Sequence, residues 1–266
     1  MKKLLFQGLT IVLFFLGTWF ILAQINWVKV FMVEEVTNKT EQELGSLFLK
    51  VYEESENENQ NPEVEALIDK MVSEICKANQ IDKEKIKVHV FDKDEINAFA
   101  LPDGHLIIYS DLILNSDNQE ELAGVICHEI AHIQLNHVMK KLVKEIGLSV
   151  LISISTGGTG AEITQQAAKT LSSSAFDRSL EKEADLAAVD YLVNAKLNPK
   201  PFADFLYKLS DNEDGIPSYL TWLETHPDSK ERATYILEYS EDKLSDFKPI
   251  LSIQDWEKLK ELLREN

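Results

Sequence analysis

Residues 118–135 read NQEELAGVICHEIAHIQL, and this stretch decides how the rest of the chain is interpreted. Asn118, followed three residues later by Glu121, resembles a capping box, which predicts that a long helix begins here. His128 and His132 lie four residues apart, so their imidazoles point the same way on a helix. Two imidazoles placed in this way can bind one Zn²⁺ ion at about 2.0–2.1 Å. The sequence therefore predicts a zinc site on this helix.

Glu129 gives the predicted site a chemical role. It follows His128 directly, so it cannot easily share the ligand plane, but it can reach a water molecule on the metal. This is the arrangement of a general base in metal-assisted hydrolysis. The same pattern can occur by chance on an amphipathic helix, but here it lies within a predicted helix and beside Val125, Ile126 and Ile133. That context favours a catalytic Glu129 over a chance match.

A catalytic zinc site needs a third protein ligand and an open fourth position. His137 is the nearest candidate, but on one continuous helix it would face away from His128, so we expect the third ligand on another element. The run LEKEAD at 180–185 lies on a predicted helix, and Glu181 and Asp185 share one face of it. Glu181 suits a ligand, and Asp185 suits a partner that holds a ligand imidazole by its other N–H. The alternative for this run is a solvated acidic face.

Three further segments accompany the histidine pair: NAFALPDG at 97–104, FDRSLEKEAD at 176–185 and THP at 225–227. With HEIAH at 128–132, they stand in an order that resembles the HtpX-like and Oma-like zinc metalloendopeptidases of peptidase family M48. That family also includes the CAAX-prenyl endopeptidases. The resemblance covers residues 61–239 and is specific, because the H-E-x-x-H pattern alone is shared by many unrelated peptidases.

The resemblance implies a gluzincin-type zinc endopeptidase with one Zn²⁺ ion per chain. The ligands that it implies are the histidine pair and one carboxylate: His128, His132 and Glu181. The implied base is Glu129, and Glu183, the rival for the third ligand, matches the motif less well. The resemblance also places His226 near the zinc, where it could donate to the developing oxyanion or occupy the open position in a resting state. From composition alone, a lone histidine before a proline is usually a surface residue.

The first 23 residues carry a membrane signal. Lys2 and Lys3 precede an uncharged, largely apolar stretch at 4–23, and about 20 such residues cross a hydrocarbon core of roughly 30 Å. The lysines would stay on the cytoplasmic side, which predicts a membrane anchor with the catalytic domain on the extracytoplasmic (periplasmic) side. Residues 21–23 make a poor cleavage site, and secretion after signal cleavage is the alternative. A single span makes the chain more similar to the periplasmic BepA-like or Loi-like branch of the family than to its polytopic members.

The remaining patterns predict an α+β fold: a mainly helical zincin-like metallopeptidase domain with a small sheet, preceded by the apolar helix. The expected segments follow one another along the chain: an anchor or signal peptide at 1–23, an acidic linker at 24–60, the metallopeptidase domain at 61–240 and a helical tail at 241–266. In the linker we expect only a short helix near 44–52. Periodicity and turn residues predict the main elements: helices at 62–76, 118–145 and 179–194, strands at 86–90 and 106–109, and a turn at 102–104.

Composition limits the classes of partner. Lys and Arg number 27 against 45 Asp and Glu, so the formal net charge is −18. A surface this acidic repels phosphate backbones, which predicts no nucleic-acid partner. Two cysteines exclude a disulfide framework and an all-thiolate zinc site. We expect a polypeptide substrate in extended form, paired with an exposed strand near 98–109, and a membrane contact through the N-terminal helix.

These observations predict a zinc-dependent metalloendopeptidase that hydrolyses peptide bonds in extracytoplasmic or membrane-proximal proteins. Misfolded or misassembled envelope proteins are the expected substrates, from the predicted location and the family resemblance. The alternative is an inactive, membrane-tethered binding or chaperone module that keeps zinc only for stability, although a structural site needs no base such as Glu129. A zinc enzyme that acts on a non-peptide substrate is a third interpretation.

Overall fold

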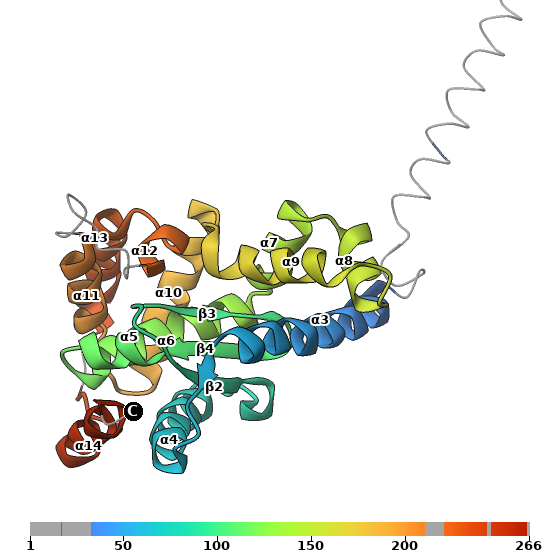
Figure 1. The fold of residues 1–266 in the computed structure, drawn as a ribbon. Coiled ribbons are helices and arrows are strands. Elements are labelled where there is room, and N and C mark those ends of the chain that lie inside the picture. Colours follow the sequence, from blue (N-terminus) through green and yellow to red (C-terminus); the bar gives the residue numbers. More distant parts are fainter. Residues whose placement is uncertain (1–16, 18–32, 211–220, 244–245, 265–266) are drawn as a thin grey trace, which may run out of the picture. The chain divides into compact units, whose positions relative to one another are not determined.

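The computed structural model describes residue 17 and residues 33–210, 221–243 and 246–264 (Figure 1). The chain divides into two compact units, Met1–Thr40 and Glu41–Asn266. The apolar helix predicted at 1–23 lies outside the described residues, apart from residue 17. Within the described part, no helix is both long and apolar enough to cross a membrane.

A four-stranded sheet runs through the second unit and, with the surrounding helices, confirms the predicted α+β class. Its strands are β1 Asn57–Glu58, β2 Lys87–Asp92, β3 Ala98–Ala100 and β4 His105–Tyr109. They stand in the order β1-β2-β4-β3, with β2 and β4 parallel and the two outer pairs antiparallel. The predicted turn at 102–104 connects β3 to β4. Gly104 has a φ of 72° there, and a Cβ would lie 1.9 Å from the carbonyl oxygen of Lys85, so the turn requires glycine.

Helices make up most of the described chain (Figure 1). They are α3 Val33–Ser55, α4 Pro62–Ala78, α5 Ser110–Asn115, α6 Gln119–Gln134, α7 His137–Glu145, α8 Leu148–Ser155, α9 Ala161–Ser173, α10 Arg178–Asn194, α11 Lys200–Ser210, α12 Thr221–Thr225, α13 Ser229–Ser240 and α14 Ile253–Arg264. The start of α6 is capped as its sequence predicts. The side chain of Asn118 accepts a hydrogen bond of 3.0 Å from the backbone N–H of Glu121, whose own carboxylate accepts one of 2.9 Å from Asp117.

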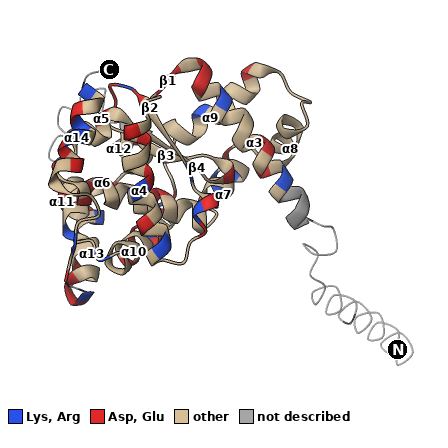
Figure 2. Cartoon of the chain, turned by 90° about the horizontal axis from the view of Figure 1, so that it is seen from below, with Lys and Arg blue, Asp and Glu red and all other residues tan. Residues whose placement is uncertain are grey.

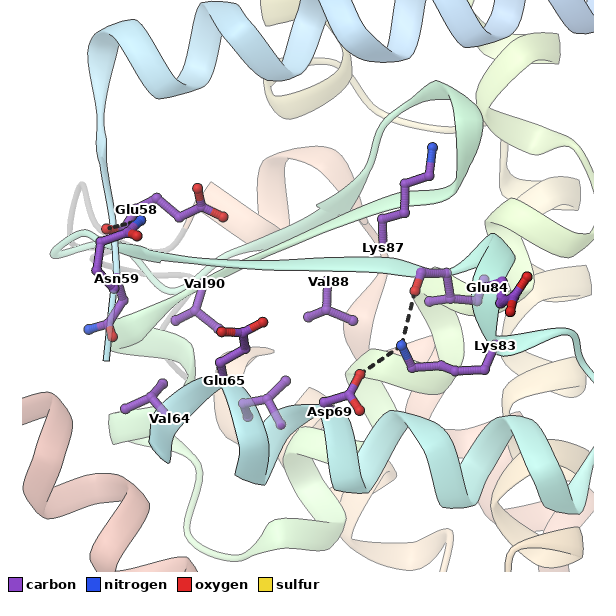
Figure 3. A pocket seen from close by; sticks show the side chains of 13 residues that line it. Glu58, Asn59, Val64, Glu65, Asp69, Lys83, Glu84, Lys87, Val88 and Val90 are labelled. Carbon is purple, nitrogen blue, oxygen red and sulfur yellow. Dashed lines mark hydrogen bonds and ion pairs between the residues drawn. The ribbon is translucent and has the colours of Figure 1, made fainter. Parts of the chain in front are cut away.

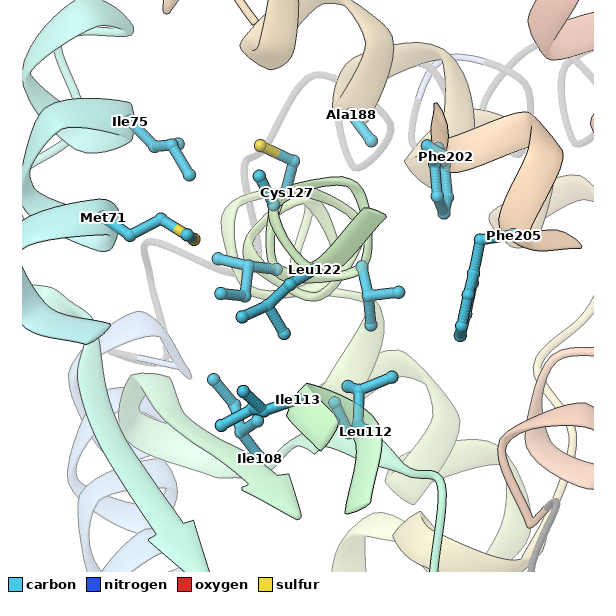
Figure 4. Packing of buried hydrophobic residues seen from close by; sticks show 14 of the residues in the cluster. Met71, Ile75, Ile108, Leu112, Ile113, Leu122, Cys127, Ala188, Phe202 and Phe205 are labelled. Carbon is cyan, nitrogen blue, oxygen red and sulfur yellow. The ribbon is translucent and has the colours of Figure 1, made fainter. Parts of the chain in front are cut away.

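Helix α6 lies at the centre of the main hydrophobic core. Every residue from Glu121 to His132 is buried, and the helix packs against α10, α11 and β3. Figure 4 shows it nearly end-on, surrounded by apolar side chains such as Met71 of α4, Phe202 of α11 and Ile108 of β4. Because core residues surround this helix, its histidines face the protein interior and not solvent.

The predicted linker contains a long helix and a strand. Helix α3 extends well beyond the short helix predicted near 44–52, and β1 follows it in the sheet. Leu44, Phe48 and Tyr52 lie four residues apart, so they share one helical face, and all three are buried in a second apolar cluster with residues of β3 and β4. This apolar spacing outweighs the charged residues between, so the helix is longer than the one expected near 44–52. The predicted domain limits themselves stay predictions.

The single long helix predicted at 118–145 is in fact two helices. Helix α6 ends at Gln134 and α7 begins at His137. Between them, Asn136 has a φ of 58°, in the left-handed region that ends an α-helix. Asparagine adopts this region more readily than most residues. The break changes the direction of the chain, so His137 does not continue the helical phase of His132.

A cavity of about 480 Å³ lies between β2 and α4, near the edge of the sheet that β1 forms (Figure 3). Its wall is polar: Glu65 and Asp69 of α4 line it, and Lys83 contacts Asp69 at 2.7 Å. Acidic and basic side chains are likewise interspersed along the described helices (Figure 2). None of the predicted site residues lines this cavity.

Gly124 lets α6 and α11 approach closely. A Cβ at this position would lie 2.4 Å from the Cβ of Phe202 on α11. We expect Gly124→Ala to lower the free energy of unfolding by about 1–3 kcal/mol, because the helices must separate and this outweighs the better helix propensity of alanine. Urea denaturation measures the change. Gly160→Ala is the control, since nothing lies within 4 Å of its Cβ; an equal loss in both variants would contradict the packing argument.

Candidate functional site

Four buried side chains that lie far apart in the sequence meet beside α6. His128 and His132 come from α6, Glu181 comes from α10, and His226 directly follows α12. Each offers one ligand atom, and these atoms all lie within 4.8 Å of one another. Glu181 is 2% exposed and the three histidines are 0% exposed. The structure thus brings the three predicted metal ligands together with His226.

Four of the distances between atoms of this cluster are close to those expected around a single ion. The Nε2 atoms of His128 and His132 are 3.0 Å apart, and Nε2 of His132 is 3.3 Å from Oε1 of Glu181. Nδ1 of His226 lies 3.2 Å from Nε2 of His128 and 2.9 Å from Oε1 of Glu181. Four ligands at about 2.0–2.1 Å from a tetrahedral zinc ion lie roughly 3.3–3.4 Å from one another. Imidazole nitrogens and a carboxylate oxygen are also donors that zinc accepts, so the residues present fit the metal.

Glu129 lies against the cluster with its carboxylate free of hydrogen bonds. The side chain is fully buried and, among the described residues, neither of its oxygens accepts a hydrogen bond. Its Oε1 lies 3.3 Å from Nε2 of His226. Burial raises the pKa of Glu129 to about 7, although the nearby His128 acts in the opposite direction. A carboxylate in this position and with this pKa can exchange a proton with a molecule bound at the cluster.

Buried ion pairs support the cluster from behind. Oδ1 of Asp185 lies 2.8 Å from Nδ1 of His128, where a partner of a ligand imidazole is expected. Arg232 of α13 donates two hydrogen bonds of 2.8 Å to Asp185, and its Nη1 lies 2.7 Å from Oε2 of Glu181. Burial alone would raise the pKa of both carboxyls, but Arg232 and the neighbouring histidines hold each pKa below its usual range. Both carboxylates are therefore charged in the protein interior.

Arg232 is the site residue that the sequence reasoning missed. It is 2% exposed and sits on a helix that the sequence marks only by its start signals and apolar residues. A single arginine belongs to none of the recognised motifs. The one available signal is its position six residues after His226. Its pairing with Glu181 and Asp185 appears only when α10 and α13 are brought side by side.

Aromatic rings hold His226 in a fixed orientation. Trp222 stacks on it with ring centroids 4.6 Å apart and an interplanar angle of 26°. Phe176 stacks on it at 5.7 Å and 21°, and also stacks on His132 at 4.0 Å. Burial lowers the pKa of His226 to about 4, so its ring is neutral at neutral pH. His226 is therefore an interior residue of the site and not a surface histidine.

His137 lies beside His132, which corrects the prediction made from a continuous helix. Because the chain turns at Asn136, Nδ1 of His137 comes within 3.1 Å of Nδ1 of His132. Glu183, the rival for the third ligand, contacts His137 instead, with Oε2 3.3 Å from its Nε2. The Glu183 side chain is 55% exposed, whereas Glu181 lies inside the cluster. Neither His137 nor Glu183 belongs to the group of potential ligands.

The family model described as Peptidase family M48 matches residues 58–240, which is more than half of the chain. The chain belongs to this family. The predicted resemblance to this peptidase family is thereby confirmed.

The M48 chain is also similar to several known proteases. Metalloprotease LoiP of Escherichia coli K12 is 31% identical over 165 residues, which cover 59% of this chain and 64% of the relative. The beta-barrel assembly-enhancing protease of the same strain is 30% identical over 166 residues, which cover 58% of this chain and 34% of the relative. The mitochondrial metalloendopeptidase OMA1 of Bos taurus is 29% identical over 163 residues, which cover 56% and 31%. The match thus covers less than two thirds of the length of each relative.

Replacing Arg232 tests the buried ion pairs. Arg232→Met keeps an apolar stem but leaves Glu181 and Asp185 buried without their cation. We expect the free energy of unfolding of the metal-free protein to fall by about 3–5 kcal/mol. Urea denaturation in the presence of a chelator measures it. Lys144→Met is the control, because the ion pair of Lys144 with Asp177 is exposed and a much smaller loss is expected. Equal losses in the two variants would count against the network.

Proposed function

We propose that this chain is a zinc-dependent metalloendopeptidase in which His128, His132 and Glu181 hold the metal. The observation that carries the proposal is the buried cluster of these three side chains with the free carboxylate of Glu129 beside it. A zinc site that serves stability alone needs no such carboxylate. Membership of peptidase family M48 supports the peptide bond as the target.

Each neighbouring residue then has a defined task. Bound Zn²⁺ supplies a Lewis acid that polarises a carbonyl and lowers the pKa of water towards about 7. Glu129 accepts the proton of the attacking water and returns it to the leaving amine, and its pKa of about 7 suits both steps. Asp185 holds Nδ1 of His128, which leaves Nε2 directed at the cluster. Arg232 keeps Glu181 ionised, the form in which a carboxylate binds a metal.

Under this proposal His226 would be a fourth residue that holds the metal in a resting state. Its Nδ1 is 2.9 Å from Glu181 and 3.2 Å from His128, so it belongs to the same set of mutually close donor atoms as the ligands. A donor to the oxyanion, the other predicted role, has to present an N–H to the substrate carbonyl. With Nδ1 turned to the ligands and Nε2 turned to Glu129, the ring supports the resting-state role.

The proposed substrate is a polypeptide that binds in extended form along β3, within the region predicted near 98–109. Among the described strands, β3 lies at the end of the sheet, and it packs against α6. Strand addition uses main-chain hydrogen bonds, which explains how a peptidase accepts many sequences. The carbonyl oxygen of Ile96, at this edge, accepts a hydrogen bond of 3.2 Å from the backbone N–H of Trp222. All three residues of β3 are buried, so the expectation of an exposed strand is wrong, and a substrate strand has to displace whatever covers this edge in order to bind there.

We infer the location from the N-terminal sequence. The apolar stretch at 4–23 behind Lys2 and Lys3 supports a membrane anchor with the peptidase domain, proposed at 61–240, on the extracytoplasmic (periplasmic) side. Cleavage of this segment and secretion is the alternative. Misfolded or misassembled envelope proteins are the proposed substrates, and an inactive zinc-stabilised binding module is the alternative function.

Glu129→Gln separates metal binding from catalysis. We expect this variant to keep one zinc per chain and to hydrolyse casein about 10²- to 10⁴-fold more slowly, because it lacks the base. Glu181→Gln and His128→Ala should lose the zinc, whereas Glu257→Gln, at an exposed glutamate of α14, is the matched control and should keep it. Elemental analysis and casein hydrolysis on the same preparations measure both. Undiminished hydrolysis by Glu129→Gln would rule out the mechanism, and zinc-loaded protein that never cleaves would favour the binding module.

Removing the His226 ring tests the resting-state role. We expect His226→Ala to keep one zinc per chain and to raise kcat/KM on a short peptide, because the fourth position is then free. His89→Ala is the control and should leave kcat/KM unchanged. His89 lies on β2, where it contacts His105 and Glu58. A fall in kcat at unchanged KM would support the oxyanion donor instead.

A further inference from the structure

The two histidines of α6 differ in what their second ring nitrogen contacts. Nδ1 of His128 lies 2.8 Å from a carboxylate, that of Asp185. Nδ1 of His132 lies 3.1 Å from another imidazole nitrogen, Nδ1 of His137. Oε2 of Glu183 in turn lies 3.3 Å from Nε2 of His137. His132 is thus connected to a carboxylate as well, but through an intervening histidine.

Hydrogen-bond chemistry favours one placement of the hydrogens along the series His132, His137 and Glu183. A neutral imidazole carries one N–H and one lone pair, and an ionised carboxylate only accepts. An imidazole that binds a metal is neutral, so His132 carries a single N–H. The negative charge of Glu183, 3.3 Å away, favours the N–H of His137 on Nε2, which leaves a lone pair on Nδ1. The hydrogen between the two rings then belongs to Nδ1 of His132.

This arrangement favours a lone pair on Nε2 of His132, against the Glu181 carboxylate, which by itself favours a hydrogen on that nitrogen. That atom faces the cluster, 3.0 Å from Nε2 of His128 and 3.3 Å from Oε1 of Glu181. In the opposite tautomer, Nε2 of His132 would carry the hydrogen and would not be able to bind a metal. Whether the group next to Nε2 of His137 accepts or donates a hydrogen bond therefore influences whether Nε2 of His132 can bind a metal.

We propose that His137 is a positioning residue: it accepts the Nδ1–H of His132 and, held by Glu183, keeps Nε2 of His132 free for the metal. The proposal rests on the function proposed above, since it assigns a metal to this cluster. It gives Glu183, the rival for the third ligand, a separate task. It also gives a task to the helix break at Asn136, which brings His137 to this place.

Packing alone does not supply this effect. Phe176 stacks on His132 at 4.0 Å and 29°, and Nζ of Lys141 lies 4.0 Å above the Phe176 ring, so the plane of His132 is held from one side. A stacked ring cannot choose which nitrogen carries the hydrogen, because that choice needs a polar partner. His137 is 0% exposed, so it excludes solvent from that place.

Substitutions of His137 and of Glu183 test the proposal. His137→Phe keeps a ring and removes the acceptor, whereas His137→Asn keeps an oxygen near the position of Nδ1. Glu183→Lys replaces the acceptor at Nε2 of His137 with a donor, which favours the opposite tautomer in both rings. Glu257→Lys makes the same charge change at an exposed glutamate of α14 and is the matched control.

Two measurements on the full chain read out the effect. Zinc affinity is measured by competition with a chelator, and the histidine tautomers of the metal-free protein are measured by ¹⁵N NMR. We expect His137→Phe and Glu183→Lys to weaken zinc binding by about 10- to 100-fold, His137→Asn to weaken it less, and Glu257→Lys to leave it unchanged. His132 should carry Nδ1–H in the unaltered chain and Nε2–H in Glu183→Lys.

The outcomes separate this inference from the proposed function. If the unaltered chain binds zinc and cleaves casein while His137→Phe and Glu183→Lys keep full affinity, the positioning role is wrong and the proposed function stands. If the unaltered chain binds no zinc, the proposed function fails and this inference fails with it. If circular dichroism shows that His137→Phe does not fold, Glu183→Lys decides, because the Glu183 side chain is 55% exposed.

Discussion

Two carboxylates buried on one face of α10, those of Glu181 and Asp185, impose the condition that the rest of the site satisfies. A buried ionised carboxylate without a partner destabilises a protein by several kcal/mol. Arg232 contacts both carboxylates, and His128 contacts Asp185. Because these partners come from α13 and α6, the acidic pair ties three helices together. Charge compensation therefore shapes the packing around the cluster before any metal is considered.

The same pairing separates the roles of two buried glutamates. Glu181 lies 2.7 Å from Arg232, and its pKa is held well below the usual range despite burial. Glu129 has no such cation against it, and burial raises its pKa to about 7. Two carboxylates that are almost equally removed from water thus differ in pKa, because His226, Arg232 and His128 lower the pKa of Glu181 more than burial raises it. The first is suited to bind a cation, and the second to carry a proton.

The sequence predicted those parts of the site that depend on spacing within one helix. His128 and His132, or Glu181 and Asp185, share a face because a helix repeats every 3.6 residues on average. Helical spacing could not predict the parts of the site that depend on a turn of the chain or on contacts between helices far apart in the sequence. The left-handed conformation of Asn136 moved His137 beside His132, and an asparagine within an otherwise helical pattern is a weak signal. Arg232 pairs with α10 across a long stretch of chain.

The fold shows the same division. The predicted strands and the turn at 102–104 were confirmed because β-branched residues and a Pro-Asp-Gly sequence act locally. Helix α3 was predicted too short, because its apolar face of Leu44, Phe48 and Tyr52 is recognised only against the sheet residues that cover it. The exposed charged residues of this helix, such as Lys50, Glu53 and Glu54, resemble a linker when they are considered alone.

Burial gives the cluster its electrostatics and also closes it. The ligands and Glu129 are at most 2% exposed, and in such an environment charges interact more strongly than in water. No peptide can reach Glu129 while His226 stays between Trp222 and Phe176. Backbone hydrogen bonds of 3.2 Å join Trp222 to Ile96 and Phe176 to Thr225, and Arg232 donates one of 3.1 Å to the carbonyl oxygen of His226. Trp222 belongs to the same hydrophobic core as α6. A substrate therefore requires His226 and its neighbouring rings to move, while the ligands on α6 and α10 stay in place.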